Sequence, residues 1–253
     1  MMKFKLGKRP TKIDKRTIRL KSILKELPLV PEKYLIDENL PVPVPLPMFA
    51  NDRYGDCVIA GRAHQTLRFE CKEQNQCISI TDEEVLEEYF NLGCMLHRWL
   101  PWLHSDRGLV MLDALNDWRS DGWVVGGKVY DIYAFAAIDI IDHYDLRAAV
   151  YYLNGGYIGF SVPDSIWKQF DSNSTWDVVP GARIEGGHCI LINGYNTVGP
   201  QAVSWGKQVQ LTWAFWDTYC DEAYAIVDNR NNWMENSLID VEKLDQILDE
   251  ITN

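Results

Sequence analysis

Helix-type and strand-type patterns are separated along this chain of 253 residues. Apolar residues at helical spacing dominate the first part, whereas β-branched and aromatic runs bounded by Gly, Asn and Pro dominate the second. An alternating βαβ arrangement needs strands and helices that follow one another in turn, so this order excludes it. The sequence therefore predicts an α+β protein with two segregated lobes, and it contains no internal repeat.

The predicted elements follow from these patterns. Asp56 is suited to cap the first helix, and Thr81-Asp-Glu-Glu84 has the form of a capping box for the second. The predicted helices cover Cys57–Cys71, Thr81–Gly93, Asp106–Trp118, Leu146–Leu153 and Leu238–Ile251. The predicted strands cover Tyr157–Val162, Cys189–Tyr195, Ala202–Trp205 and Ala223–Asp228, and Val209–Tyr219 fits either type.

Charge divides the chain into a basic arm and an acidic body. Residues 1–25 hold ten basic residues and one acid, a net +9; because the whole chain carries −11, residues 26–253 carry −20. The arm fits three interpretations: a polyanion-binding tail, a segment docked on an acidic partner or on its own body, or a solvated tail. Its apolar residues favour docking on protein, and the acidic body excludes a nucleic-acid groove. These apolar residues are Ile13, Ile18, Leu20, Ile23 and Leu24.

Residues 26–50 contain six prolines, which fix φ and remove backbone donors. We expect this stretch to run extended over the surface of the body. The predicted organisation is thus an N-terminal arm over 1–50 and one domain over 51–253. That domain divides into a helical lobe over about 51–150, a β lobe over about 151–235 and a C-terminal helix over about 236–253. We expect the body to fold without residues 1–25.

The sequence shows no candidate membrane span and no secretory signal. No apolar run approaches the ~20 residues that cross a bilayer, and the N-terminus has no apolar core. We expect a cytoplasmic protein, or a virion component if a phage encodes it. Six cysteines are too few for a disulfide scaffold, so mostly reduced thiols are expected. Cys94, His97 and His104 fit no common zinc spacing, and no metal is expected.

Cys57 is the candidate nucleophile. It stands where the first predicted helix begins, and the free N–H groups of a helix N-terminus stabilise a thiolate. A histidine must reach it through space. His188 is the best candidate, because it opens an apolar strand after Gly186 and Gly187, which remove side chains from its surroundings. His64, seven residues along the same helix, fits a structural position better.

The segment Asn51-Asp-Arg-Tyr-Gly-Asp-Cys57 resembles the start of the papain-like cysteine peptidases. In that family a glutamine lies six residues before the nucleophile and a glycine two before it. Here these positions hold Asn51 and Gly55. The later half is similar too: His188 leads into Gly194-Tyr195, and Val203-Ser-Trp-Gly206 follows. The resemblance extends from about residue 50 to about residue 230, with Glu222–Ile226 similar to the closing strand.

Two positions depart from the family pattern. The asparagine that orients the histidine is replaced by Val203, which cannot accept an imidazole N–H. Ser204 is adjacent, but strand alternation predicts that it faces the other side of the strand. Trp205 matches the family tryptophan and receives a supporting role. The glycine pair that holds substrate backbone has no counterpart, since Gly126-Gly127 lies later in the chain.

The resemblance implies a cysteine peptidase or related thiol hydrolase that needs no cofactor and acts on peptides or proteins. Cys57 would attack, His188 would transfer the proton, and Asn51 with the Cys57 N–H would hold the oxyanion. Two alternatives remain open: an inactive papain-like scaffold, such as a phage virion component, and an acyltransferase. The short basic arm differs from the longer helical propeptides of the family, so a surface-wrapping or partner-docking arm is expected. Trp99, Trp102, Trp118 and Trp123 are candidate cleft residues, with burial as the simpler alternative.

Overall fold

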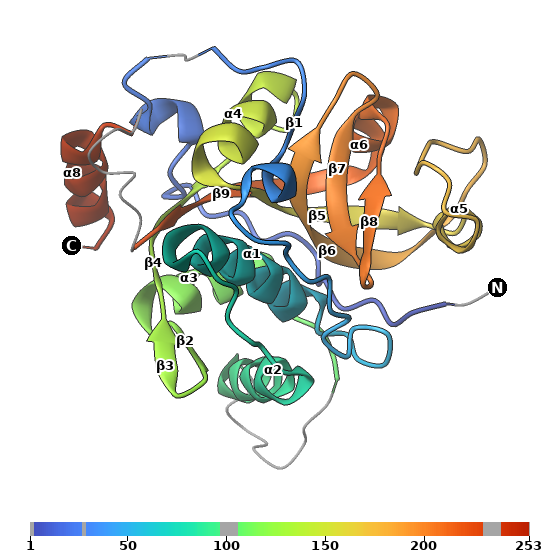
Figure 1. Ribbon diagram of the computed structural model, residues 1–253, viewed down its shortest axis with the longest axis horizontal. Helices are drawn as coiled ribbons and strands as arrows, with labels where there is room; N and C mark the ends of the chain where they lie inside the picture. The colour runs from blue at the N-terminus through green and yellow to red at the C-terminus, as the bar shows by residue number, and fades with distance from the viewer. Residues whose placement is uncertain (1–2, 27–28, 97–105, 230–238, 253) are drawn as a thin grey trace.

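The computed structural model describes residues 3–26, 29–96, 106–229 and 239–252. Figure 1 shows two lobes, with α1 near the centre and the sheet to one side of it. Within the described residues, no helix is long and apolar enough to span a membrane.

The β lobe is built on a seven-stranded antiparallel sheet. The strand order is β4 (Ile132–Ala137), β9 (Cys220–Asp228), β5 (Gly156–Pro163), β6 (Ile184–Tyr195), β7 (Pro200–Ser204) and β8 (Lys207–Gln210), and β1 (Tyr34–Leu35) also pairs with β6. The predicted segregation of helices and strands is confirmed. The sheet is open and does not close into a barrel.

The helical lobe lies against β6 and contains its own core (Figure 1). Its elements are α1 (Cys57–Gln74), α2 (Asp82–Leu96), α3 (Met111–Ser120) and a hairpin of β2 (Trp123–Val125) and β3 (Lys128–Tyr130). Helix α1 is almost wholly buried, because it packs against α2, α3 and the sheet at once. It carries the candidate nucleophile at its first residue, so the position of that residue is fixed by the core.

Two helix boundaries differ from the prediction at a glycine. The capping box of α2 forms as expected, with Glu84 N donating to Thr81 Oγ1 at 3.2 Å, but the helix continues past Gly93. Nothing crowds Gly93, so it remains helical at the modest cost of a glycine in a helix. Helix α3 begins at Met111 rather than Asp106, because Gly108 has a φ of +72° and breaks the helical path.

The remaining helices surround the other parts of the sheet. They are α4 (His143–Leu153), α5 (Ile166–Asp171), α6 (Trp213–Tyr219) and α8 (Val241–Thr252), with short 3₁₀ turns η1 (Leu20–Ile23) and η2 (Ile36–Asn39). The ambiguous segment Val209–Tyr219 divides between β8 and α6. The prediction missed α5 and the strands β2–β4. The sequence pattern does not predict β4, because most of its residues are buried and the strand therefore lacks the alternation typical of a half-buried strand.

Part of the arm belongs to the core. Ile18, Leu20 and Ile23 are buried against the sheet and α4. The expectation that the body folds without residues 1–25 stays a prediction, but these contacts count against it, since removal of the residues would strip apolar contacts from the main core.

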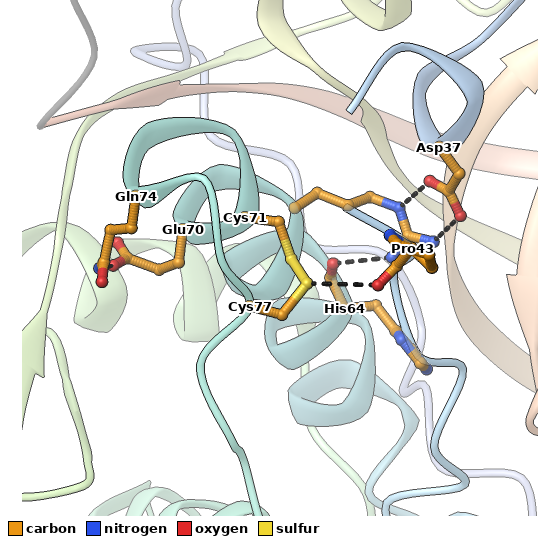
Figure 2. Close-up of a disulfide and its surroundings, with 8 residues drawn as sticks. Asp37, Pro43, His64, Glu70, Cys71, Gln74 and Cys77 are labelled. Carbon is orange, nitrogen blue, oxygen red and sulfur yellow. Dashed lines mark hydrogen bonds and ion pairs between the residues drawn. A yellow bond between two sulfur atoms is a disulfide. The ribbon is translucent and has the colours of Figure 1, made fainter. Parts of the chain in front are cut away.

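The expectation of reduced thiols is wrong for one pair. Cys71 and Cys77 form a disulfide that joins the last turn of α1 to the segment before α2. Figure 2 shows the bond beside Pro43, whose carbonyl oxygen lies 3.7 Å from Cys77 Sγ. Asn75, in the left-handed conformation, ends α1 and turns the chain back, which brings the two cysteines together.

Two of the four candidate cleft tryptophans, Trp118 and Trp123, are core residues of the helical lobe. Trp99 and Trp102 lie outside the described residues, as do His97 and His104. Among the residues that the structure describes, no group of His, Cys, Asp and Glu has the arrangement of a metal site.

Candidate active site

Cys57 is the first residue of α1 and is fully buried. The first N–H groups of a helix have no intrahelical partner, so the backbone here presents donors beside the thiol. Burial raises the pKa of the Cys57 thiol to about 12, with hydrogen bonds from the backbone of Cys189 and Gly7 acting in the opposite direction. Cys189 follows His188 on β6, and the backbone contact therefore joins the start of α1 to the strand of the candidate histidine.

His188 is held by two residues that follow β6 in the chain. Its Nε2 lies 2.9 Å from Ser204 Oγ, and its ring stacks on Trp205 with a centroid distance of 4.1 Å and an interplanar angle of 10°. Its Nδ1 is buried and has no hydrogen-bond partner in the described part of the chain. Burial lowers the pKa of His188 to about 3. The imidazole is therefore neutral, and Nδ1 is the ring nitrogen without a partner in the described residues.

The prediction that Ser204 faces away from His188 is wrong. Val203 pairs with Leu191, and Ser204 is the last residue of β7, immediately before a turn at which Trp205 has a φ of +46°. In this antiparallel register the next pair after Leu191 and Val203 is Ile190 and Ser204, and Ile190 lies on the same face of β6 as His188, so Ser204 reaches the imidazole and Trp205 covers it. The serine thus supplies the polar contact that Val203 cannot make.

Asn51 lies beside the helix start, but its amide is already engaged. Its Nδ2 donates to Asp56 Oδ1 at 2.7 Å and to the Tyr54 carbonyl at 3.3 Å. Asp56 occupies the N-cap position without a capping hydrogen bond from its side chain, contrary to the prediction. Burial raises the pKa of Asp56 to about 7, against the lowering effect of the Asn51 hydrogen bond.

The N-terminal arm passes through the space between the two lobes. Lys8 N donates to the Gly187 carbonyl at 3.1 Å, and Lys8 also bridges to Leu109 beside α3. Around that bridge, Leu109 N donates to Gly7 O and Arg9 N donates to Leu109 O, both at 2.9 Å. Figure 1 shows the arm, in dark blue, running inward from the N-terminus. Residues before His188 and residues before α3 therefore hold one extended strand between them.

Glycines make this close approach possible. A Cβ on Gly7 would lie 1.7 Å from the Gly55 carbonyl oxygen, and a Cβ on Gly187 would lie 2.6 Å from the Lys8 carbonyl oxygen. Gly55 N donates to Asp106 Oδ1 at 2.8 Å, which fixes the loop before Cys57. The supporting roles expected for Gly55 and Gly187 thus have a structural counterpart, which is contact with the arm.

Side chains of the arm reach both lobes. Phe4 packs on Trp205, with ring centroids 5.2 Å apart, and on Phe170. Lys3 pairs with Glu185 and Lys5 with Asp106. The basic arm therefore docks on its own acidic body. Leu109, Gly7 and Lys8 were not singled out from the sequence, because nothing local marks a residue whose partner lies about a hundred positions away.

Comparisons with known proteins agree with this geometry. No family model and no curated protein matches the chain. Among solved structures, it is similar to xylellain, a cysteine protease from Xylella fastidiosa, with a TM-score of 0.67, 16% identity, and coverage of 89% of this chain and 96% of that one.

Two further structures resemble it. For procathepsin B S9 from Trypanosoma congolense, the TM-score is 0.58 at 13% identity, covering 89% of this chain and 87% of that one. For the Carica candamarcensis cysteine protease CMS1MS2, the TM-score is 0.55 at 12% identity, covering 79% of this chain and 100% of that one. The chain therefore has the fold of the papain-like cysteine proteases.

Proposed function

We propose that this protein is a cysteine peptidase in which Cys57 is the nucleophile and His188 the general base, held inactive while residues 3–9 occupy the cleft. The observation that supports this proposal is a cysteine at the start of α1, a helix that packs against the strand β6, which carries a histidine with one ring nitrogen bound to Ser204, in a papain-like fold. The other ring nitrogen of His188 has no hydrogen-bond partner among the described residues.

The proposed chemistry uses both ring nitrogens. With Nε2–H donating to Ser204 Oγ, Nδ1 is the nitrogen that accepts the Cys57 proton. The thiolate adds to the substrate carbonyl carbon, His188 then protonates the leaving amine, and water hydrolyses the thioester. The Cys57 N–H stabilises the oxyanion. Asn51 would join it by giving up its longer hydrogen bond, the one to Tyr54.

The arm blocks this chemistry in two ways. The Gly7 backbone is hydrogen-bonded at the Cys57 thiol, so the arm occupies the position that a substrate peptide would need. The closed cleft also keeps thiol and imidazole desolvated. Burial raises the pKa of Cys57 and lowers that of His188, so both groups are neutral at pH 7. Two of the similar solved structures, procathepsin B and the ragweed protease Amb a 11, are also proforms.

The test compares the full chain with its Gly7→Ala variant, whose added Cβ is incompatible with the seated arm. We expect Gly7→Ala to hydrolyse a mixed fluorogenic peptide library and to react rapidly with iodoacetamide at Cys57, located by peptide mapping. Cys57→Ala or His188→Ala in that background should abolish hydrolysis. Cys220→Ala, which removes another free thiol, is the matched control.

Slow labelling of Cys57 in Gly7→Ala, indifferent to His188 and without hydrolysis, would overturn the proposal. It would leave the second candidate, a papain-like scaffold that acts through binding.

A further inference from the structure

The side chain of Lys8 enters a pocket of the body and ends between two carboxylates. Its Nζ lies 2.8 Å from Asp221 Oδ1 and 2.9 Å from Glu222 Oε1. The Lys8 and Glu222 side chains are only 2% and 3% exposed, whereas Asp221 is 33% exposed. Tyr224 Oη donates to the other carboxylate oxygen of Glu222 at 3.0 Å, and this hydrogen bond fixes the orientation of the carboxylate.

The walls of this pocket are shaped for a long, unbranched side chain. A Cβ on Gly159 would lie 2.0 Å from Lys8 Cε and 2.7 Å from Met111 Sδ. Gly159 therefore makes room for the methylene chain, while β9 supplies the acidic end. Any larger residue at position 159 would close the pocket before its carboxylates were reached.

The pocket adjoins the reacting atoms. Lys8 is bound through its backbone to Gly187, the residue before His188, and the preceding residue, Gly7, has its N–H at the Cys57 sulfur. A chain that occupies the cleft thus places one side chain in the acidic pocket and the neighbouring peptide unit at the nucleophile.

Removing the arm leaves the two carboxylates without their cation. A buried carboxylate is costly unless a positive charge or hydrogen bonds compensate it, and the other described donors to the Glu222 carboxylate are the neutral hydroxyls of Tyr224 and Thr11. A ligand with a long cationic side chain would restore the ion pairs, whereas an apolar chain of the same length would leave the charge uncompensated.

We propose that the pocket of Gly159, Met111, Asp221 and Glu222 selects a lysine or arginine side chain in peptide substrates, and that Lys8 occupies it as an internal mimic. This inference rests on the proposed peptidase function and assigns its substrate class: peptides with a basic residue near the cleaved bond.

The first experiment measures specificity in the full chain carrying Gly7→Ala and Lys8→Ala. Fluorogenic tetrapeptides with alanine elsewhere carry either lysine or norleucine at each position in turn, so the members of each pair differ only in the amine. We expect one position at which lysine raises kcat/KM by about thirtyfold or more over norleucine, because truncating one partner of a buried charge pair is expensive.

Adding Asp221→Asn and Glu222→Gln should reduce that preference to about threefold or less. Glu83→Gln, which removes an exposed carboxylate of α2, is the matched control and should retain the full preference. Equal rates for lysine and norleucine at every position, or a preference that survives the double carboxylate change, would overturn the inference.

A second measurement does not depend on catalysis. Cys57→Ala is added to the same background, and binding of the fluorescein-labelled peptide Phe-Lys-Leu-Gly-Lys-Arg, the sequence of residues 4–9, is compared with its norleucine analogue at the position of Lys8. If no peptide is hydrolysed but the lysine peptide binds about thirtyfold tighter, the peptidase proposal fails and the pocket stands. If the lysine and norleucine peptides bind equally, or if neither binds, the proposed lysine pocket is overturned. Should the arm remain bound in the cleft of the Lys8→Ala chain, Lys8→Glu replaces that change, because it sets a third carboxylate against Asp221 and Glu222.

Discussion

His188 is positioned by a serine, a tryptophan and its own burial. The hydroxyl of Ser204 fixes Nε2, and the stacked indole of Trp205 leaves the ring little rotational freedom. Because Nδ1 has no partner in the described residues, the orientation of the ring depends on one hydrogen bond, the stacking on Trp205 and an edge contact with Phe160. A serine can accept from a protonated or a neutral imidazole, so it can serve throughout the proposed reaction.

We expect Ser204→Ala to lower kcat of the Gly7→Ala chain by about tenfold, equivalent to ~1.4 kcal/mol, with KM nearly unchanged. The reason is that the imidazole loses control of its tautomer and rotamer, while substrate contacts remain. Ser204→Asn should restore part of the rate and shift the acid limb of the pH–rate profile. Ser120→Ala, on the surface of α3, is the control. A kcat unchanged by Ser204→Ala would show that the contacts with Trp205 and Phe160 position the ring without the hydrogen bond.

At the scale of elements, the disulfide joins α1 to the approach of α2. It closes a short loop, since Cys71 and Cys77 are six positions apart. The chain-entropy relation for a loop of this size gives about 2 kcal/mol of stabilisation. We expect Cys71→Ser with Cys77→Ser to lower the free energy of unfolding by that amount in urea titrations. The same loss should follow from dithiothreitol treatment of the unchanged chain, and the double variant should then be insensitive to dithiothreitol.

The arm is itself an element with two separable parts. Residues 3–9 lie in the cleft, while Ile18, Leu20 and Ile23 lie in the core. Burial of one such aliphatic side chain contributes roughly 1.5–3 kcal/mol. Deletion of residues 1–25 should therefore lower the free energy of unfolding by about 4 kcal/mol or more, whereas deletion of residues 1–10 should cost far less. Urea titrations of the two deletions test this, and equal stabilities would contradict the division.

At the scale of the whole molecule, the seating of the arm should depend on pH. Burial lowers the pKa of His188 to about 3, and the hydrogen bond from Lys3 lowers the pKa of Glu185. Release of the arm hydrates the cleft and returns the pKa values of His188 and Glu185 toward their ordinary values, near 6.5 and 4.3. The released state therefore binds more protons below pH 6.5, so acid favours release.

We expect the unchanged chain to show more Cys57 labelling by a thiol-reactive disulfide probe at pH 4.5 than at pH 7.5, although acid itself disfavours thiolates. Gly7→Ala, already released, should lack this increase and is the control. The prediction fails if the labelling of both proteins falls in parallel as the pH is lowered.

Several features were readable from the sequence by itself. The separation of helix and strand patterns determined the fold class, the capping box at Thr81 determined the start of α2, and the spacing around Cys57 and His188 indicated the papain-like fold. These are local signals, because they depend on turn chemistry, on periodicity and on short-range spacing. The helix-N-terminal position of the candidate nucleophile belongs with them.

Only the tertiary structure decided what surrounds those residues. Ser204 contacts His188 because the register of β6 and β7 sets it opposite Ile190, on the face of His188, and a pairing register is not readable from one strand. Lys8 meets Asp221 and Glu222, and Gly7 meets Gly55, across separations that no local pattern spans. The positive charge of the arm indicated that it docks on protein, but not where on the protein it binds. That place depends on the shape of a cleft formed by two lobes, and such a shape exists only after the chain has folded.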